Sequence, residues 1–207
     1  MFAQAFLAVL LIFLVVLLYW YLLRRSSGQI RYQYECLGKR FGLELTAPNA
    51  MLFGFVRPEP FLHGNYRQRE VSISAPGKGL QNTRQTETVL KLSVADKGLR
   101  LQMTSSGWLS GMSQRDSGEK VRWLSGDTDF DSALDVRTND GVRLAMLLAP
   151  EARKALQKLL AGRGASLYLG NGVLAFACSG LLADDATRLR FEEAMEVLCN
   201  FGELLEG

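Results

Sequence analysis

The densest group of side chains that could do chemistry is a run of aspartates, Asp127-Thr-Asp129-Phe-Asp131, followed by Asp135. Aspartate oxygens are the ligands that hard cations such as Ca²⁺ and Mg²⁺ prefer. The composition of residues 130–138 predicts a strand, and the alternation of a strand would place three of the carboxylates on one face. Asp127, Asp129, Asp131 and Asp135 are therefore candidate metal ligands.

The same aspartates also fit a structural interpretation, a polar turn that enters a strand. In this interpretation the side chains accept hydrogen bonds from backbone amides while Phe130 packs inward. The run is not an EF-hand loop, because the sixth position is Ser132 instead of glycine and the twelfth is Thr138 instead of glutamate. Both interpretations remain open from the sequence.

Other catalytic patterns find no support. His63 is the single histidine, and neither Gly-x-Ser-x-Gly nor His-Glu-x-x-His is present. Gly77-Lys78-Gly79 lacks the strand and helix that must flank a phosphate-binding loop. Basic residues are not interleaved with aromatic residues on one expected surface, so nucleic acid is not an expected partner. We predict no catalytic residue and no cofactor.

The sequence gives a stronger signal for membrane attachment than for any catalytic or metal site. Residues 2–23 carry no charge, proline or glycine, and about 20 apolar residues span a hydrocarbon core of about 30 Å as a helix. Tyr19, Trp20 and Tyr21 stand where aromatic rings prefer the headgroup layer, and Arg24 and Arg25 follow. Residues 1–25 are thus predicted to be a transmembrane anchor.

A cleaved signal peptide and a buried core helix are the competing interpretations. A signal peptide needs a basic start and small residues before the cleavage site, and neither is found. The basic side chains all follow the apolar segment, which predicts that the N-terminus lies outside and the larger domain in the cytoplasm, at the inner membrane. Cys36, Cys178 and Cys199 are an odd number in apolar surroundings, which favours reduced, packed thiols.

Charge divides the rest of the chain unequally. Residues 24–100 carry a balance of +7 and residues 101–207 a balance of −4, which together give the net charge of +3. The basic part is nearest the anchor in sequence, so it could lie against anionic lipid, where each basic group contributes about 1 kcal/mol. Alternatively, the basic residues only solubilise a β-rich layer.

Between the anchor and residue 125 the pattern predicts a membrane-proximal, β-rich half, residues 26–125. A helix over residues 30–45 continues from the anchor or is hinged to it at Ser26-Ser27-Gly28. Short alternating runs predict strands at residues 61–66, 70–75, 86–94 and 98–104. The last two are expected to form a hairpin around Asp96-Lys97-Gly98, and the Gly- and Ser-rich residues 105–119 a loop.

Residues 126–207 are predicted to be an α+β half with a helix–hairpin–helix order. Asn139 or Asp140 can cap a short helix, and Pro150 fits the first position of another. Gly170-Asn171-Gly172 predicts a type I′ hairpin, and Asp184 or Asp185 a cap for a long final helix. That helix is apolar over more than one face, so it is either buried between layers, which we favour, or paired with another chain. The fold class is α+β with an antiparallel sheet.

The stretch from Ser125 to Thr138, with its Gly-Asp, Phe-Asp and Val-Arg pairs, resembles a signature of bacterial single-span, membrane-anchored proteins of unknown function. Gly64-Asn-Tyr-Arg and the Leu147-Leu148 pair extend the resemblance, which implies architecture and topology but no reaction. The chain departs from it at Leu134, where an aromatic residue is expected.

Together these features predict a single-pass membrane protein whose cytoplasmic domain is a protein-interaction, assembly or scaffolding subunit. Its expected partners are the lipid bilayer and a protein, either a different protein or a second copy of the chain. The alternative is a metal-dependent enzyme or a ligand sensor held at the membrane, using Asp127 to Asp131.

Overall fold

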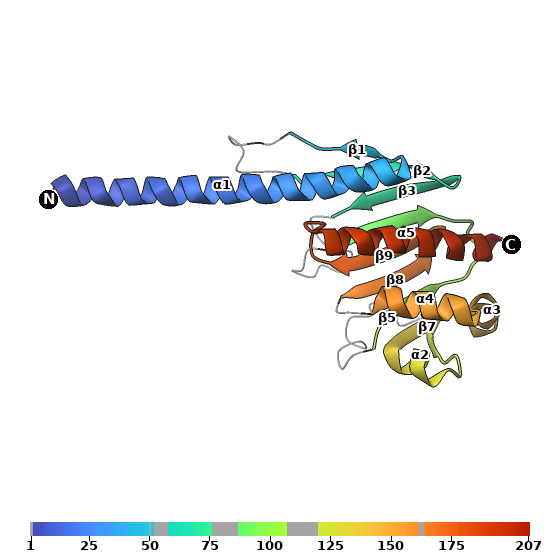
Figure 1. Cartoon of the computed structure of the whole chain (residues 1–207). Helices are drawn as coiled ribbons and strands as arrows, with labels where there is room; N and C mark the ends of the chain where they lie inside the picture. Colours follow the sequence, from blue (N-terminus) through green and yellow to red (C-terminus); the bar gives the residue numbers. More distant parts are fainter. Residues whose placement is uncertain (1, 50, 52–57, 76–86, 107–119, 162–163) are drawn as a thin grey trace.

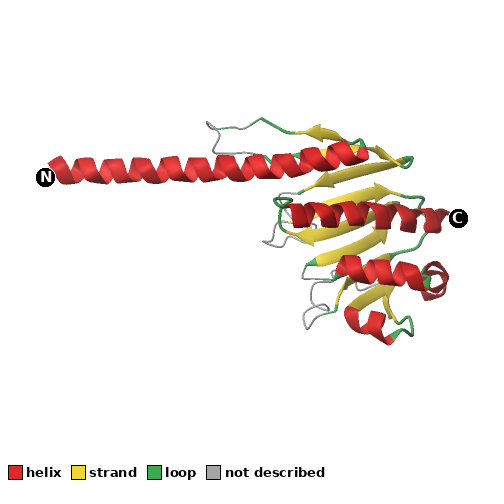
Figure 2. Cartoon of the chain, viewed as in Figure 1, coloured by secondary structure: helices red, strands yellow, loops and turns green. Residues whose placement is uncertain are grey.

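The computed structural model of the chain describes residues 2–49, 51, 58–75, 87–106, 120–161 and 164–207. A long N-terminal helix leads into a nine-stranded antiparallel sheet, and the helices lie on one face of that sheet (Figure 1; Figure 2). The predicted α+β class, with an antiparallel sheet behind an apolar N-terminal helix, is confirmed. Of the predicted loop at residues 105–119, Ser105 is the last residue of a strand and residues 107–119 lie outside the described residues.

The helices are α1 (Phe2–Phe41), α2 (Thr128–Ala133), α3 (Gly141–Leu147), α4 (Pro150–Leu160) and α5 (Asp185–Glu206). The strands are β1 (Glu44–Thr46), β2 (Phe61–Tyr66), β3 (Arg69–Ser74), β4 (Glu87–Ser93), β5 (Leu101–Ser105), β6 (Val121–Trp123), β7 (Leu134–Thr138), β8 (Ala165–Gly170) and β9 (Val173–Ser179). Their order across the sheet is β1-β2-β3-β4-β9-β8-β5-β7-β6, so strands from both sequence halves share one sheet.

Helix α1 runs without interruption through Ser26-Ser27-Gly28, so the helix after residue 30 continues from the apolar segment instead of being hinged to it. Its first part projects away from the sheet (Figure 1), and the domain begins to bury the helix at Ile30. By length and composition it is the one helix of the described chain that is apolar enough to cross a membrane.

One row of cross-strand neighbours shows how the core is built. Each strand places one apolar residue in this row, on the face that carries the helices: Leu45, Leu62, Ile73, Leu90, Phe176, Leu167, Met103, Val136 and Trp123. Helix α1 covers β1 and β2, α5 covers β4 and β9, α4 covers β8 and β5, and α2 packs on β7. The alternation of each strand thus directs its apolar side chains under the helices.

The predicted hairpin between β4 and β5 is wrong. Both sides of β4 are taken, by β3 and β9, while β5 pairs with β7 and β8. The turn itself forms, because the Asp96 carboxylate accepts the Gly98 N–H and Gly98 adopts a φ of 78°. However, the chain passes the β8–β9 turn, where the Val94 N–H donates to the Gly172 carbonyl, before it enters β5.

The predicted strand at residues 130–138 is also wrong in its first part. Asp127 accepts hydrogen bonds from the backbone N–H groups of Asp129 and Phe130, and this cap starts α2. Strand β7 begins only at Leu134. The side-chain alternation assumed for the aspartates is therefore absent.

Several local predictions are confirmed. Asp140 caps α3 and Asp184 caps α5, in each case by accepting a backbone N–H three residues later. Pro150 is the first residue of α4. Asn171 and Gly172 have φ values of 52° and 74° in the β8–β9 turn, as the two central residues of a type I′ turn require.

Candidate functional site

The aspartate cluster serves backbone structure instead of forming a metal site. Asp127 caps α2, and the Asp131 carboxylate accepts hydrogen bonds from the N–H groups of Ser125 and Gly126. Asp135 lies on β7 between Arg122 and Arg137, at 3.9 and 3.6 Å. Asp129 lies in the first turn of α2. Within the described residues no three His, Cys, Asp or Glu side chains gather as a metal site would require, so the geometry expected for metal binding is not formed.

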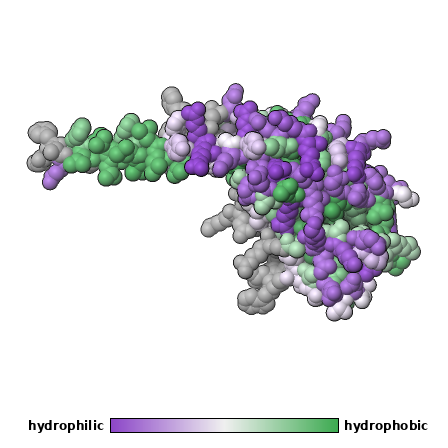
Figure 3. Space-filling view, in the orientation of Figure 1, coloured by the Kyte–Doolittle hydropathy of each residue, from purple (hydrophilic) through white to green (hydrophobic). Residues whose placement is uncertain are grey.

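The residues predicted at the membrane interface lie on the projecting part of α1. Tyr19 and Tyr21 are exposed, and the Arg24 guanidinium lies 5.3 Å from the ring centre of Trp20. Arg25 follows in the same helix. Figure 3 shows this part of α1 as an apolar cylinder that ends where the polar domain begins. The apolar window of this helix is not buried within the domain.

The joint between α1 and the domain is both apolar and ionic. Tyr34, Leu37 and Phe41 on α1 are buried in the main core. Glu192 of α5 is 4% exposed and pairs with Arg188 on its own helix and with Arg40 of α1, at 2.5 Å from the latter. The part of α1 from Ile30 to Phe41 is therefore an integral part of the domain, and the projecting part is continuous with it.

A smaller polar network strengthens the same joint at the end nearest the projecting part of α1. The Gln33 amide on α1 donates to the Asp185 carboxylate at 3.2 Å, and Arg188 Nε donates to the Gln33 oxygen at 3.0 Å. Gln33 is buried, so both ends of its amide need these partners. The start of α5 is thus tied to α1 where α1 enters the domain.

Basic residues close to the anchor in sequence are not all close to it in space. Arg67 and Arg69 lie at the β2–β3 turn, beside the C-terminal end of α5, which is the end of the domain opposite the projecting helix (Figure 1). Arg69 donates two hydrogen bonds to Glu206, at 2.5 and 2.7 Å. These bonds, with one from the Ala95 N–H, lower the pKa of Glu206 to about 2. Arg67 and Arg69 therefore fasten the sheet to α5 and do not face the membrane.

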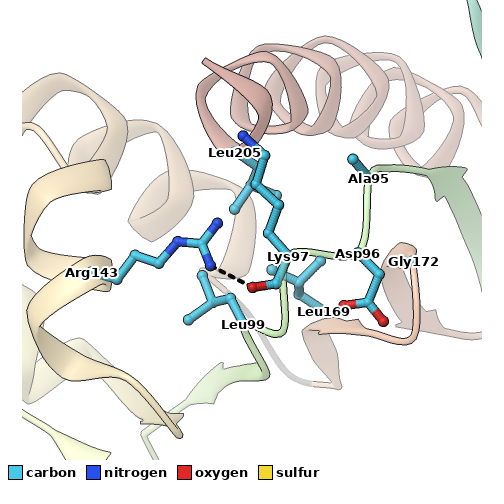
Figure 4. Close-up of a pocket in the computed structure, with 8 residues that line it drawn as sticks. All are labelled: Ala95, Asp96, Lys97, Leu99, Arg143, Leu169, Gly172 and Leu205. Atoms are coloured by element: carbon cyan, nitrogen blue, oxygen red, sulfur yellow. Dashed lines mark hydrogen bonds between the residues drawn. The ribbon is translucent and has the colours of Figure 1, made fainter.

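Beside them, the β4–β5 connection packs against α3 and the end of α5 (Figure 4). Arg143 donates to the Lys97 carbonyl at 2.7 Å, and Lys97 Nζ donates to the Glu206 carbonyl, also at 2.7 Å. The enclosed space is about 10 Å³, which is room for one water molecule. This pocket is a structural joint with space for a water molecule only.

Helix α5 is buried on one face only, since it packs on β4 and β9 with α1 and α4 beside it, so the expectation that it is buried between two layers is wrong. Phe191, Met195, Leu198 and Phe201 are all within the core, while Leu204 is exposed. The three cysteines are free, which agrees with the expectation of packed thiols. His63 lies on β2 and is half exposed. Its Nε2 atom lies 3.6 Å from the Glu44 carboxylate.

Among the described residues, a group of exposed apolar side chains lies at the β6 end of the sheet. At the β6 end of the sheet, Val121 and Trp123 are the last residues of two cross-strand rows. Leu124 follows β6 in the chain. Helix α3 adds Val142 and Met146, and exposed fractions here reach 73% for Val121 and 80% for Met146. We call these five residues, Val121, Trp123, Leu124, Val142 and Met146, the edge patch.

Three residues of the edge patch, Trp123, Val142 and Met146, lie around a shallow, wide-open depression between β6 and α3. Trp123 packs so closely on the first residue of α3 that a Cβ at Gly141 would lie 2.7 Å from Trp123 Cδ1. Trp123, Val142, Ala145 and Met146 then line an open hollow of about 670 Å³. In Figure 3 apolar side chains gather at this edge of the domain, where α3 lies. These exposed apolar side chains are the candidate interaction surface of the described domain.

Sequence reasoning missed the edge patch, although two signals point to it. The segment Lys120-Val-Arg-Trp-Leu alternates basic and apolar residues as a strand does. In α3, Val142 and Met146 lie on a different side from the buried Leu144 and Leu148, so the helix has apolar residues on two sides.

No family model, curated protein sequence or solved structure matches the chain. The resemblance to bacterial single-span proteins therefore stays a prediction. The function has to be argued from the geometry of the domain itself.

Proposed function

We propose that the chain is a single-span membrane protein whose α+β domain lies in the cytoplasm and binds a partner protein at the edge patch. The observation that carries the proposal is the uncovered end of the apolar core rows at β6, beside the exposed apolar side of α3. Monomeric domains rarely leave a contiguous apolar surface rimmed by polar groups unless it contacts another molecule.

The anchor supports the cellular location in this proposal. Helix α1 is long and apolar enough to span a bilayer, and no basic residue precedes Arg24. Arg24, Arg25 and Arg31 follow on the same helix, which favours the cytoplasmic side for the domain. A reporter that is active only outside the cytoplasm, fused after Gly207, should be inactive, and an active fusion would contradict this topology.

The position of the edge patch favours a protein over the lipid surface. Helix α3 lies at the end of the domain that points away from the projecting part of α1 (Figure 1). Because α1 is continuous and fixed to the domain, the bilayer that holds the anchor is not in reach of α3. A partner protein in the cytoplasm can reach it freely.

In-cell photo-crosslinking tests the proposed surface. A photoreactive phenylalanine analogue at Met146 should give a defined protein adduct, and the same analogue at Phe61, beside the opposite edge of the sheet, should not. Val142→Asp should suppress the Met146 adduct, because burying an unpaired carboxylate in an apolar contact is costly. Equal adducts from both positions, or an adduct insensitive to Val142→Asp, would contradict the proposal.

A further inference from the structure

Strand β6 offers more than apolar side chains, because it is an edge strand. In the described sheet it pairs with β7, through Val121, Arg122 and Trp123, and it is last in the strand order. An edge strand presents backbone N–H and C=O groups that can pair with a further strand. Extended peptides bind many domains by adding a strand in this way, often beside a helix.

The two faces of β6 differ in chemistry. Val121 and Trp123 point to the helix face and join α3 in the edge patch. Arg122 points to the other face, where it lies directly opposite Arg137 of β7. Their side chains are 58% and 25% exposed, and Asp135 lies between them. Like charges directly opposite each other destabilise a sheet, so this row is short of negative charge.

Lys120 adds to the same charge imbalance. It precedes β6 by one position, and its ammonium lies 5.0 Å from the ring centre of Tyr168 and 3.4 Å from the Gln102 oxygen. Tyr168, Gln102, Arg137 and Arg122 form one cross-strand row. Near β6, the described part of this face thus carries three basic side chains against the carboxylate of Asp135.

We propose, resting on the proposed function, that the partner adds an extended strand to β6 in which apolar residues alternate with Asp or Glu. Its apolar side chains pack on Trp123, Val142 and Met146, on the helix face of the sheet. Its carboxylates alternate with the apolar side chains along the strand. They therefore point to the opposite face of the sheet, toward Arg122 and Arg137. The backbone pairing gives affinity, and the two faces together select the alternating apolar and acidic pattern.

The charges favour such a strand over a second copy of this chain. Two β6 strands in antiparallel pairing would bring the basic faces of both strands, each with Arg122, into one row. That arrangement adds like charges to a row that already holds an arginine pair. A strand rich in Asp or Glu has the opposite effect.

Peptide binding to the full-length protein in neutral phosphatidylcholine nanodiscs tests the inference. The probe is a short fluorescent peptide that alternates valine and glutamate, and fluorescence anisotropy measures its affinity. One control peptide has the same composition with its valines and glutamates in separate blocks, and another alternates valine and lysine. The valine–glutamate alternation should bind at least about ten-fold more tightly than either control. Equal binding of the block peptide overturns the inference, because strand addition requires the alternation.

Charge reversal on β6 tests the second face. Arg122→Glu should weaken the valine–glutamate peptide about ten-fold and strengthen the valine–lysine peptide. Lys91→Glu is the matched control, since it makes the same charge change at an exposed position of the same sheet face, on β4. It should change either affinity by less than about two-fold. Arg122→Glu without a change in preference overturns the inference, as does an equal effect of Lys91→Glu.

The outcomes separate this inference from the proposed function. If Val142→Asp suppresses the Met146 adduct in cells but the valine–glutamate peptide does not bind, the edge patch still binds a partner and the strand mode is wrong. If the Met146 adduct is insensitive to Val142→Asp, the proposed function itself fails. A stable dimer in nanodiscs that is lost in Val142→Asp would assign the edge patch to a second copy and overturn the inference.

Discussion

The two edges of the sheet differ in how far the described helices cover them. At the β1 edge, the second half of α1 lies over β1 and β2 and covers the ends of the apolar rows. At the β6 edge the same rows end on Val121, which is exposed, and on Trp123, which is half-buried. Helix α1 therefore completes the core on one side, and among the described residues no helix covers the other side.

The two sides of the sheet also differ in their ion pairs. On the covered side, ion pairs link separate elements: Arg40 of α1 to Glu192, and Arg67 and Arg69 near β3 to Glu196 and Glu206 of α5. Near β6, Arg122 and Arg137 both approach Asp135 within the sheet, and Arg153 of α4 lies 4.0 Å from Asp127, the cap of α2. The covered side thus has one ion pair at the joint with α1 and others at the opposite end of the domain, beside the C-terminal end of α5.

The largest effect should come from the core of the covered side. Leu37→Ala removes a fully buried side chain of α1 and should lower the free energy of unfolding by about 3 kcal/mol. Denaturant unfolding of the full-length protein in detergent measures the change. Val142→Ala at the open edge is the control and should cost less than about 0.5 kcal/mol. Equal losses would show that α1 does not complete the core.

The buried carboxylate at the anchor joint should have the next largest effect. Glu192→Gln leaves Arg40 and Arg188 without their shared partner and should cost about 2 kcal/mol. The adjacent Glu193→Gln is a matched control, because Glu193 is partly exposed and pairs only at the surface with Lys158. It should cost less than about 0.5 kcal/mol, and a similar cost for both would refute the special role of the joint.

The pairing of Glu206 with Arg69 should give a smaller, pH-dependent effect. Its pKa of about 2 in the fold lies below the ordinary value of 4.5 expected when unfolded. The ionised carboxylate therefore stabilises the fold above about pH 4.5, and this contribution is lost as the pH falls toward 2. Glu206→Gln should cost about 1 kcal/mol at pH 7 and much less near pH 2.

Thermal unfolding at both pH values measures this difference. Glu203→Gln is the control, since Glu203 is more exposed and 3.5 Å from Arg67. A Glu206→Gln effect that is independent of pH would contradict the ion pair with Arg69.

The smallest stability effect is expected at the open edge. Met146→Ser changes an exposed residue of α3 and should alter the free energy of unfolding by less than about 0.5 kcal/mol. Leu144→Ser on the same helix replaces a buried residue and should cost about 3 kcal/mol. Denaturant unfolding compares the two. A large loss for Met146→Ser would mean that the edge patch belongs to the core.

Local sequence patterns predicted several helices, helix caps and one turn correctly. The apolar run of α1, the caps at Asp140 and Asp184, Pro150 and the Asn171-Gly172 turn each act within a few residues, so their patterns predicted the correct element. The aspartate cluster shows the limit of such signals. A strand and a capped helix both fit its residues, and the cap at Asp127 decided the outcome.

Strand order could not be predicted in the same way. The turn at Asp96-Lys97-Gly98 is real, but the β8–β9 hairpin, more than 60 residues later in the chain, lies between the two strands that the turn connects. Nothing near the turn encodes that insertion. For the same reason the edge patch was missed, because Trp123 and Met146 meet only after β6 and α3 have taken their places.

The sequence by itself determined that the chain has one apolar helix able to span a membrane, an α+β domain and no recognisable catalytic motif, because composition and local spacing carry those properties. The tertiary structure alone decided which residues remain uncovered. Burial depends on how many layers lie over a strand, and α1 supplies that layer at β1 while no described helix supplies it at β6. The open edge is a property of the assembled sheet and not of any segment.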